Sequence, residues 1–551
     1  MRPADILKHL GSALGGGVTF LVMGMGSNPV WAQAAEGEVI RHPASLAVIA
    51  AFFVVACVVL VGARWAVERA HVLLYAHSEI SDPKGRWHGL SLSGAHLSAA
   101  ALLGLPALML TPDGGAFLWI AGLLAGWPLL ALLLAERLRN LGMLTFADTL
   151  VWRAPSHALR VLAAVGTLLV TLLYLSAQII GAGQVLGALF GLEYWLAVLI
   201  AGSLMMATAL YCGRMALTWL AIVKTMALLL LLTLLAALAL WTFGFSAEGT
   251  DGAPPFAAAL SADFLARQTP LDQWSLGLTL VFGLIGLPHL LMRFTAASAQ
   301  SAHVARQGGL WAGTWTGVFS GLLLIIGLGV AHLPGKEAVM QFLALRDNNS
   351  LALLYLAESV GGGALMGATA AVVLIALLTV AVSLGHAAAA AVAHDVYASV
   401  LRGGRIGEAR ELKFAHLGIV LLFALAMLLG IVCAGQSLVL PVALALALAA
   451  STHAPMLLLS LSWKGCTRRG AFIGGAGGLF SALLLILFSP PIWVTLLGHA
   501  VAPFPYALPT LFSMSFALLL TWAFSLADKS ARATQERADW PRQQARAETG
   551  I

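Results

Sequence analysis

The sequence predicts an all-α membrane protein. Of its 551 residues, 60% are hydrophobic and 10% are charged, and the mean hydropathy of +0.92 lies far above that of soluble globular chains. Apolar runs of about 17 to 25 residues recur along the whole chain, and a helix of that length crosses about 30 Å of hydrocarbon. Barrel strands are much shorter, so the spanning elements are predicted to be helices.

Residues 1–34 are predicted to be a signal peptide. Arg2 and Lys8 precede an apolar, glycine-rich stretch, and Ala32-Gln33-Ala34 has the small-x-small pattern of a cleavage site. A short uncleaved anchor is the alternative. Cleavage after Ala34 would leave the mature N-terminus outside the membrane.

A transmembrane domain is predicted over residues 35–526, followed by a polar tail over 527–551. Thirteen spans are expected, near residues 46–63, 89–111, 116–135, 161–189, 194–211, 218–243, 274–292, 310–333, 363–393, 415–434, 438–462, 471–489 and 509–526.

The distribution of Lys and Arg predicts the orientation. With the mature N-terminus outside, the inside loops and tail hold 24 Lys and Arg, counting Arg214, Lys224 and Arg293, and the outside loops hold four. A basic inner face toward anionic lipid accounts for the net charge of +6, so no nucleic-acid partner is needed. No obligate protein partner is evident.

Two spans are interrupted in the same way. Gly94, Gly104 and Pro106 punctuate the span at 89–111, and Gly283, Gly286 and Pro288 punctuate the span at 274–292. Broken helices at matching positions of two halves point to an inverted-repeat secondary transporter with a site at mid-membrane, here with repeats of about 89–243 and 274–462. The alternative is that the small residues only permit close helix packing.

Three polar residues share one stripe of the span at 363–393. Thr379, Ser383 and His386 are spaced by four and three residues, so two hydroxyls and an imidazole face the same way. Hydroxyl and carbonyl oxygens suit sodium. The alternative is that each hydroxyl bonds back to the carbonyl four residues earlier.

Histidines inside the spans are candidates for function because ionisable groups are costly there. His96 and His386 could carry a coupling proton, and His289, after Pro288, lies at a predicted break. A neutral histidine bonded to a neighbour is the alternative. Asp395 and Glu136 lie at inner helix ends, where capping or gating ion pairs are expected.

No phosphate-binding glycine loop, metal-ligand cluster or nucleophile motif is present, which excludes an enzyme and a bound cofactor.

Several motifs closely resemble the bacterial cation/acetate symporters of the sodium:solute symporter family. They are "GWPLLALLLAERLRNLGMLTFAD" (Gly126 to Asp148), "LYLSAQIIGAG" (Leu173 to Gly183), "GLPHLLMRF" (Gly286 to Phe294), "AHDVY" (Ala393 to Tyr397) and "PPIWVTLLGHAVAPFPYALPTLFSMSFA" (Pro490 to Ala517). The resemblance implies a LeuT-like core of five-plus-five inverted repeats in a bacterial inner membrane, with a periplasmic N-terminus and a cytoplasmic C-terminus. It also implies that acetate or a similar short monocarboxylate enters with a cation.

The resemblance places a sodium site on the carbonyls of Gly94 and Leu97 and the hydroxyl of Thr379. It places Ser98, Tyr174 and Gln178 in the central cavity, where His96, Pro288 and His289 also lie near the breaks. The acetate symporters have an acidic residue and a tyrosine where this chain has Ala95 and His96, and they have serines at the positions of Ala390 and Ala393. These changes remove the strongest local attraction for a cation.

Three functions remain open. The first is monocarboxylate import with sodium at Gly94, Leu97, Thr379 and Ser383. The second is the same transport with a proton on His96 or His386. The third is a sensor or assembly partner that has the transporter fold and no longer moves a solute.

Overall fold

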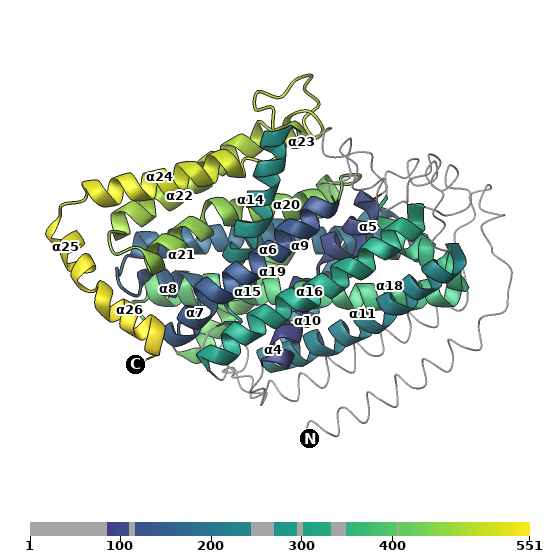
Figure 1. Ribbon diagram of the computed structural model, residues 1–551, viewed down its shortest axis with the longest axis horizontal. Coiled ribbons are helices and arrows are strands. Elements are labelled where there is room, and N and C mark those ends of the chain that lie inside the picture. The colour runs from purple at the N-terminus through teal and green to yellow at the C-terminus, as the bar shows by residue number, and fades with distance from the viewer. Residues whose placement is uncertain are drawn as a thin grey trace.

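The computed structural model describes residues 85–109, 116–243, 269–294, 301–331, 349–404 and 407–550. These residues are almost entirely helical and pack into one bundle (Figure 1). Ten helices are long and apolar enough to cross a membrane, or eleven if one bent pair is counted as a span. The predicted all-α membrane class is confirmed. The predicted signal peptide and the span at 46–63 lie outside the described residues.

Every predicted span from 89–111 onward coincides with described helix. The elements are α4 (Arg86–His96), η2 (Ala100–Gly104), α5 (Leu105–Leu108), α6 (Ala116–Leu129), η3 (Leu130–Ala135), α7 (Glu136–Leu141), α8 (Phe146–Val151), α9 (His157–Phe190), α10 (Tyr194–Tyr211), α11 (Arg214–Phe243), α14 (Pro270–Gly286), α15 (Pro288–Leu291), α16 (Ala302–Ala331), η4 (Asn349–Leu351), α18 (Ala352–Ala390), η5 (Ala391–Leu401), α19 (Glu408–Val432), α20 (Val439–Ser451), α21 (His453–Ser462), α22 (Arg468–Leu487), α23 (Pro490–Trp493), α24 (Thr510–Ala527), α25 (Ala531–Ala538) and α26 (Trp540–Thr549).

Helix α18 begins before the span predicted at 363–393, and a kink explains the difference. Gly362 has φ 68° and ψ −172°, a conformation that an L side chain rarely adopts, and it divides residues 352–361 from the rest of α18. The part of α18 beyond this kink coincides with the predicted span.

Two helices break partway through their spans, as predicted. Helix α4 ends at His96, Leu97 has an extended ψ of 94°, and the chain continues through η2 and α5 with a bend of 70°. Helix α14 ends at Gly286, Leu287 has a ψ of 112°, and α15 follows. Each break frees backbone carbonyls and amides in the middle of the protein.

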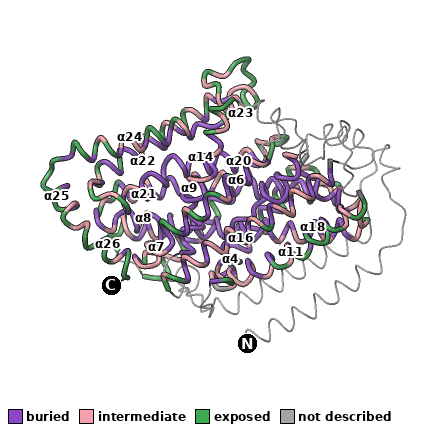
Figure 2. Tube along the Cα trace, viewed as in Figure 1, coloured by how far each residue is buried: buried purple, intermediate pink, exposed green. Residues whose placement is uncertain are grey.

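The broken helices lie among longer ones. Helix α4 packs against α11 and α16, and α14 packs against α6 and α20, while α9, α10, α18 and α19 pack against one another. Figure 2 shows that these central elements are mostly buried, with exposed side chains on the outer faces. The two breaks therefore face a packed interior and not lipid.

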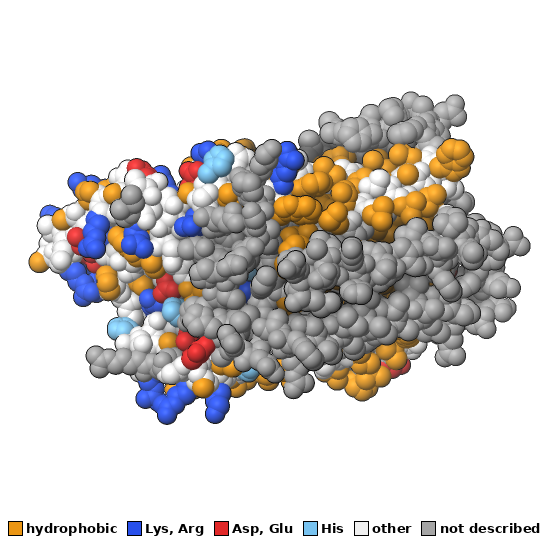
Figure 3. Space-filling view, turned by 90° about the horizontal axis from the view of Figure 1, so that it is seen from below, with side chains coloured by type: hydrophobic (Ala, Val, Ile, Leu, Met, Phe, Trp, Pro, Cys, Tyr) orange, Lys and Arg blue, Asp and Glu red, His pale blue; other side chains and the backbone are white. Residues whose placement is uncertain are grey.

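The polar tail forms two helices that fold back onto the protein (Figure 1). The Asn140 side chain of α7 donates to the Ala547 carbonyl of α26 at 3.0 Å, and the Arg153 guanidinium lies 4.9 Å from the centre of the Trp540 ring. Figure 3 shows Lys and Arg side chains gathered toward the end of the molecule that carries α25 and α26. This is the end that the charge distribution predicts to be cytoplasmic.

Candidate functional site

Two neighbouring helices, α11 and α9, contact the break in α4. A Cβ atom at Gly94 would lie 2.8 Å from the Ala221 carbonyl and would clash with the Thr225 hydroxyl, so only glycine lets α11 approach this closely. On the other side, the backbone N–H of Ala99 donates to the Gln178 side chain of α9 at 2.9 Å. Gln178 thus satisfies a backbone donor that the break leaves free.

The break in α14 is supported in a similar manner. The Gly286 carbonyl bonds to the His453 ring at 2.8 Å, and a Cβ at Gly286 would lie 2.6 Å from the Ala449 carbonyl of α20. Pro288 starts α15 at a position where a missing N–H costs no hydrogen bond. His289 follows it and points into the interior, only 2% exposed.

Two histidines lie at the breaks with ring nitrogens that have no hydrogen-bond partner among the described residues. His96 ends α4 and packs edge-on against Trp127 at 5.7 Å, and His289 lies 5.4 Å from the Tyr174 ring. Tyr174 also bonds to Ser98, within the break of α4. Buried polar groups normally have partners, so these nitrogens are available to a solute or to water.

A cavity opens beside the breaks, on the side where α4 and α11 begin. It encloses about 470 Å³ not filled by protein atoms, including the part open to solvent. None of its lining residues is acidic, and they are His88, Ser91, Arg214, Leu217, Thr218, His289, Met292, Arg293, Ser383 and His386. The cavity wall therefore carries only cationic, neutral polar and apolar groups.

Arg293, in the segment that follows α15, connects this cavity wall to two other helices. Its guanidinium donates to the Ser91 hydroxyl of α4 at 2.8 Å and to the Ser383 hydroxyl of α18 at 3.1 Å. Arg214 donates to the Met292 carbonyl at 3.0 Å. Arg293 is 9% exposed and forms no ion pair with any described carboxylate. Its charge is available to an anion.

The stripe predicted on α18 is divided between two environments. Ser383 and His386 line the cavity, and the His386 ring bonds to the Ala209 carbonyl at 3.3 Å. The Thr379 hydroxyl instead donates back to the Ile375 carbonyl at 2.7 Å. The spacing thus places the three residues as predicted, and for Thr379 the back-bonded alternative describes this structure.

Lys224 occupies the space between the break of α4 and α18, and its position corrects the sequence analysis. Its Nζ donates to the Leu97 carbonyl at 3.3 Å and to the Ala376 carbonyl at 3.2 Å, and the residue is 1% exposed. Lys224 and Arg293 are therefore not loop charges, because both are buried in the interior, whereas Arg214 is partly exposed at the start of α11. The sequence does indicate the buried position of Lys224, since this residue falls inside the predicted span 218–243.

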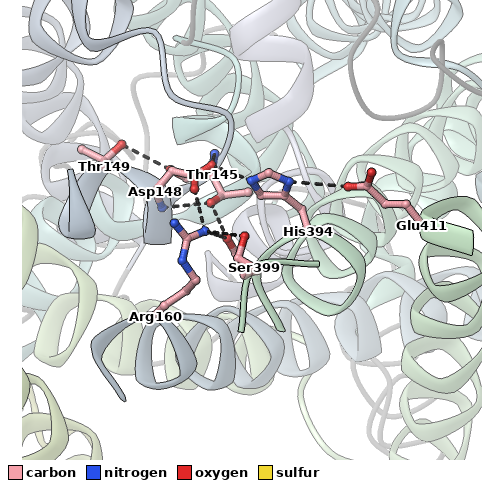
Figure 4. A network of polar contacts seen from close by, with 8 residues as sticks. Thr145, Asp148, Thr149, Arg160, His394, Ser399 and Glu411 are labelled. Atoms are coloured by element: carbon pink, nitrogen blue, oxygen red, sulfur yellow. Dashed lines mark hydrogen bonds and ion pairs between the residues drawn. The ribbon is translucent and has the colours of Figure 1, made fainter. Parts of the chain in front are cut away.

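A second buried cluster of charge joins α8, α9, η5 and α19 (Figure 4). Arg160 contacts Asp148 at 2.6 Å and Asp395 at 3.2 Å, and His394 lies 3.0 Å from Asp148 and 3.5 Å from Glu411. Burial alone would raise the pKa of Asp148, but its contacts with His394 and Arg160 hold that pKa at about 2. This network confirms that Asp395 belongs to an ion pair at a helix end.

Asp148, His394 and Asp395 also have the residue types of a metal site, with ligand atoms within 4.8 Å of one another. Arg160 already occupies the space between the two aspartates. The cluster is better described as a structural network.

Comparison with known proteins identifies the fold. A model of the sodium:solute symporter family matches residues 85–478. A Na⁺-coupled sialic acid symporter, solved in a substrate-bound outward-open state, is similar over 88% of this chain and 98% of its own, with a TM-score of 0.67 and 14% identity. A nucleobase-cation-symport-1 family transporter is similar over 88% of this chain and 100% of its own, with a TM-score of 0.51 and 13% identity. Because both have the LeuT fold, the predicted LeuT-like fold is confirmed.

Proposed function

The chain belongs to the sodium:solute symporter family, and we propose that it imports a short monocarboxylate such as acetate together with a cation. Secondary active symport, and not catalysis, is the activity of this family and of the similar structures. The proposed part is the class of solute. We also propose a bacterial inner membrane as the location, with the C-terminus in the cytoplasm.

The observation that carries the proposal is the positive charge of the side chains that line the cavity. Arg214 and Arg293 face it together with three histidines, and no described lining residue is acidic. Positive groups in a wall that is partly screened from water attract an anion more strongly than exposed groups do. A monocarboxylate matches the guanidinium of Arg293, whose hydrogen bonds now go to neutral hydroxyls.

The breaks provide a second set of partners for the carboxylate. The free ring nitrogens of His96 and His289, with Ser98 and Tyr174 beside them, lie next to the exposed backbone of both broken helices. We propose that the solute binds here and leaves past Arg293 when the cavity side is open. Gln178 acts as a positioning residue, because it holds the Ala99 amide in place.

A sodium site at Gly94, Leu97 and Thr379 remains a prediction. Leu97 has left the helical conformation, with a ψ of 94°, as such a site requires. Under this alternative, Thr379→Ala weakens uptake and its sodium dependence together.

Counterflow in proteoliposomes tests the class of solute. Vesicles loaded with an unlabelled carboxylate should take up the labelled one transiently, with acetate, propionate, lactate and pyruvate compared against succinate and an uncharged amide. Protein-free liposomes correct for permeation of the neutral acid. We expect exchange for the monocarboxylates only. Equal exchange of the uncharged amide, or exchange of none of the panel, would contradict the proposal.

A further inference from the structure

The position of Lys224 suggests which cation accompanies the solute. We propose that the Lys224 ammonium takes the place of a bound metal cation between the break of α4 and α18, and that its proton is the cation moved with the solute. The inference rests on the proposed function and makes it more specific. It assigns a role to a residue that the sodium prediction does not use.

The contacts of Lys224 are those expected of a cation site. Leu97 has left the helical conformation, so its carbonyl lacks the backbone donor that a continuous helix would supply. The Lys224 Nζ donates to that carbonyl at 3.3 Å and to the Ala376 carbonyl at 3.2 Å. One ammonium therefore joins the broken helix to α18, and Thr379 lies one helical turn beyond Ala376.

The close packing of α11 against α4 places the Lys224 amine beside the Leu97 carbonyl. Ala221 and Thr225 pack against Gly94, and Lys224 follows Ala221 by three residues, a spacing that places these two residues on one side of α11. A larger residue at Gly94 would push α11 away and withdraw the amine. The glycine that was predicted to supply a sodium ligand thus has a second role, which is to admit the helix that carries the lysine.

The charges around Lys224 disfavour an added metal cation and favour an anion. From α4 the titratable group that faces it is His96, and from the segment after α15 it is Arg293. The contacted part of α18 carries no titratable group until His386, and α16 carries its own, His303 and Arg306, in its first turns. No described carboxylate neutralises Lys224. A sodium ion on the Leu97 carbonyl would lie beside an ammonium and be repelled by it.

This arrangement couples the proton to the solute. A proton from water binds the lone pair of the neutral amine and gives an ammonium with two N–H···O=C bonds, and no other bond changes. A carboxylate bound at the breaks stabilises that ammonium, which contacts the Leu97 carbonyl there, and the ammonium equally raises the affinity for the carboxylate, because binding linkage is reciprocal. Release of the anion on the inner side lets the amine return its proton to the inner water.

Ion gradients applied separately to proteoliposomes of the full-length protein test the inference. Labelled pyruvate is the probe, because so little of it is protonated near neutral pH that passive permeation is small. We expect an inward proton gradient, with choline replacing sodium, to drive accumulation at least fivefold above protein-free vesicles. An inward sodium gradient at equal pH should add no more than an equal potassium gradient.

Lys224→Gln should lose the accumulation driven by the proton gradient, and pyruvate counterflow should persist only with a lower apparent affinity, because the ammonium that favours the carboxylate is gone. Lys529→Gln, which removes an exposed lysine of the tail, is the matched control and should behave as the wild type. Accumulation driven by sodium alone in the wild type, or by protons in Lys224→Gln, would overturn the inference. If Lys224→Gln does not fold, the wild-type gradients still decide. Absence of counterflow in the wild type would instead overturn the proposed solute, and the inference with it.

Discussion

The molecule contains two buried clusters of charge, and they are organised in opposite ways. In the network around Arg160, two aspartates contact the guanidinium, and His394 joins one of them, Asp148, to Glu411, all within 3.5 Å. Around the breaks, Arg293 and Lys224 donate only to hydroxyls and carbonyls. The first cluster pairs its charges internally, whereas the second forms no ion pair with a carboxylate in the part of the chain that the structure describes.

The difference follows from the elements that each cluster joins. Asp148, Arg160, His394 and Glu411 come from α8, α9, η5 and α19, which pack against one another away from the breaks. Lys224 and Arg293 connect the broken helices to α18, where hydrogen bonds must change when the site opens. We infer that the paired network stabilises the frame and that the unpaired cations bind the solute.

Removing the central cation of the paired network should have the largest effect. Arg160→Met leaves Asp148 and Asp395 facing each other, and removing one partner of a buried ion pair costs about 3 kcal/mol. We expect thermal unfolding in detergent to show a clear loss of stability. The control is Arg306→Met, which breaks the pair between Arg306 and Glu136, where both side chains are more than a third exposed; its effect should be below about 1 kcal/mol. Equal losses in the two variants would refute the assignment of a structural role.

Removing a cation from the unpaired cluster should have the opposite signature. In Arg293→Gln no described carboxylate loses a partner, so the unfolding temperature should stay the same or rise. The apparent affinity for a monocarboxylate should fall about 10- to 100-fold, as expected for loss of a hydrogen bond to a charged group. Concentration-dependent uptake measures this, and Arg293→Lys should recover part of it. If Arg293→Gln lowered the unfolding temperature and left the affinity for the monocarboxylate unchanged, Arg293 would have a structural role like that of Arg160.

The contrast also shows what the sequence could predict. Glycine and proline in matching places predicted both breaks because these residues act locally on the backbone. The spacing of Ser383 and His386 placed them on one face for the same reason. The partners of Lys224, however, are 127 and 152 residues away in the chain, and those of Arg293 are 202 and 90 residues away. The periodicity of residue types along one helix carries no information on contacts between residues so far apart in the sequence.

The positive-inside rule does not identify these residues as functional. Lys and Arg near helix ends report orientation, and this rule assigns Lys224, Arg214 and Arg293 to loops. A lysine seven residues inside an apolar run is better interpreted as an intramembrane charge with a function. The orientation survives the correction, since the inside keeps its large excess of Lys and Arg without these three.

The paired network should also respond to acid. The pKa of Asp148 is held at about 2, below its usual 3.8, so its charge stabilises the folded state at neutral pH by roughly 2 kcal/mol. Because the folded pKa is the lower one, this stabilisation is present above about pH 4 and is lost as the pH falls toward 2. Asp148→Asn keeps the shape of the side chain and lacks the charge. Its unfolding temperature should lie below that of the wild type at pH 6 and approach it at low pH. A constant difference across this range would contradict the ion-pair description.

The smallest effects should come from the hydroxyls on α18, and they distinguish the two descriptions of the cation site. Thr379 bonds back to its own helix, so if Lys224 supplies the cation, Thr379→Ala changes uptake less than about twofold, the size expected for a weak local hydrogen bond. Ser383 accepts from Arg293, so Ser383→Ala should lower the affinity for the solute somewhat more, by about threefold. Uptake measured with and without sodium decides between them. A large, sodium-dependent defect in Thr379→Ala would favour the sodium site over Lys224, because only a metal ion needs that hydroxyl as a ligand.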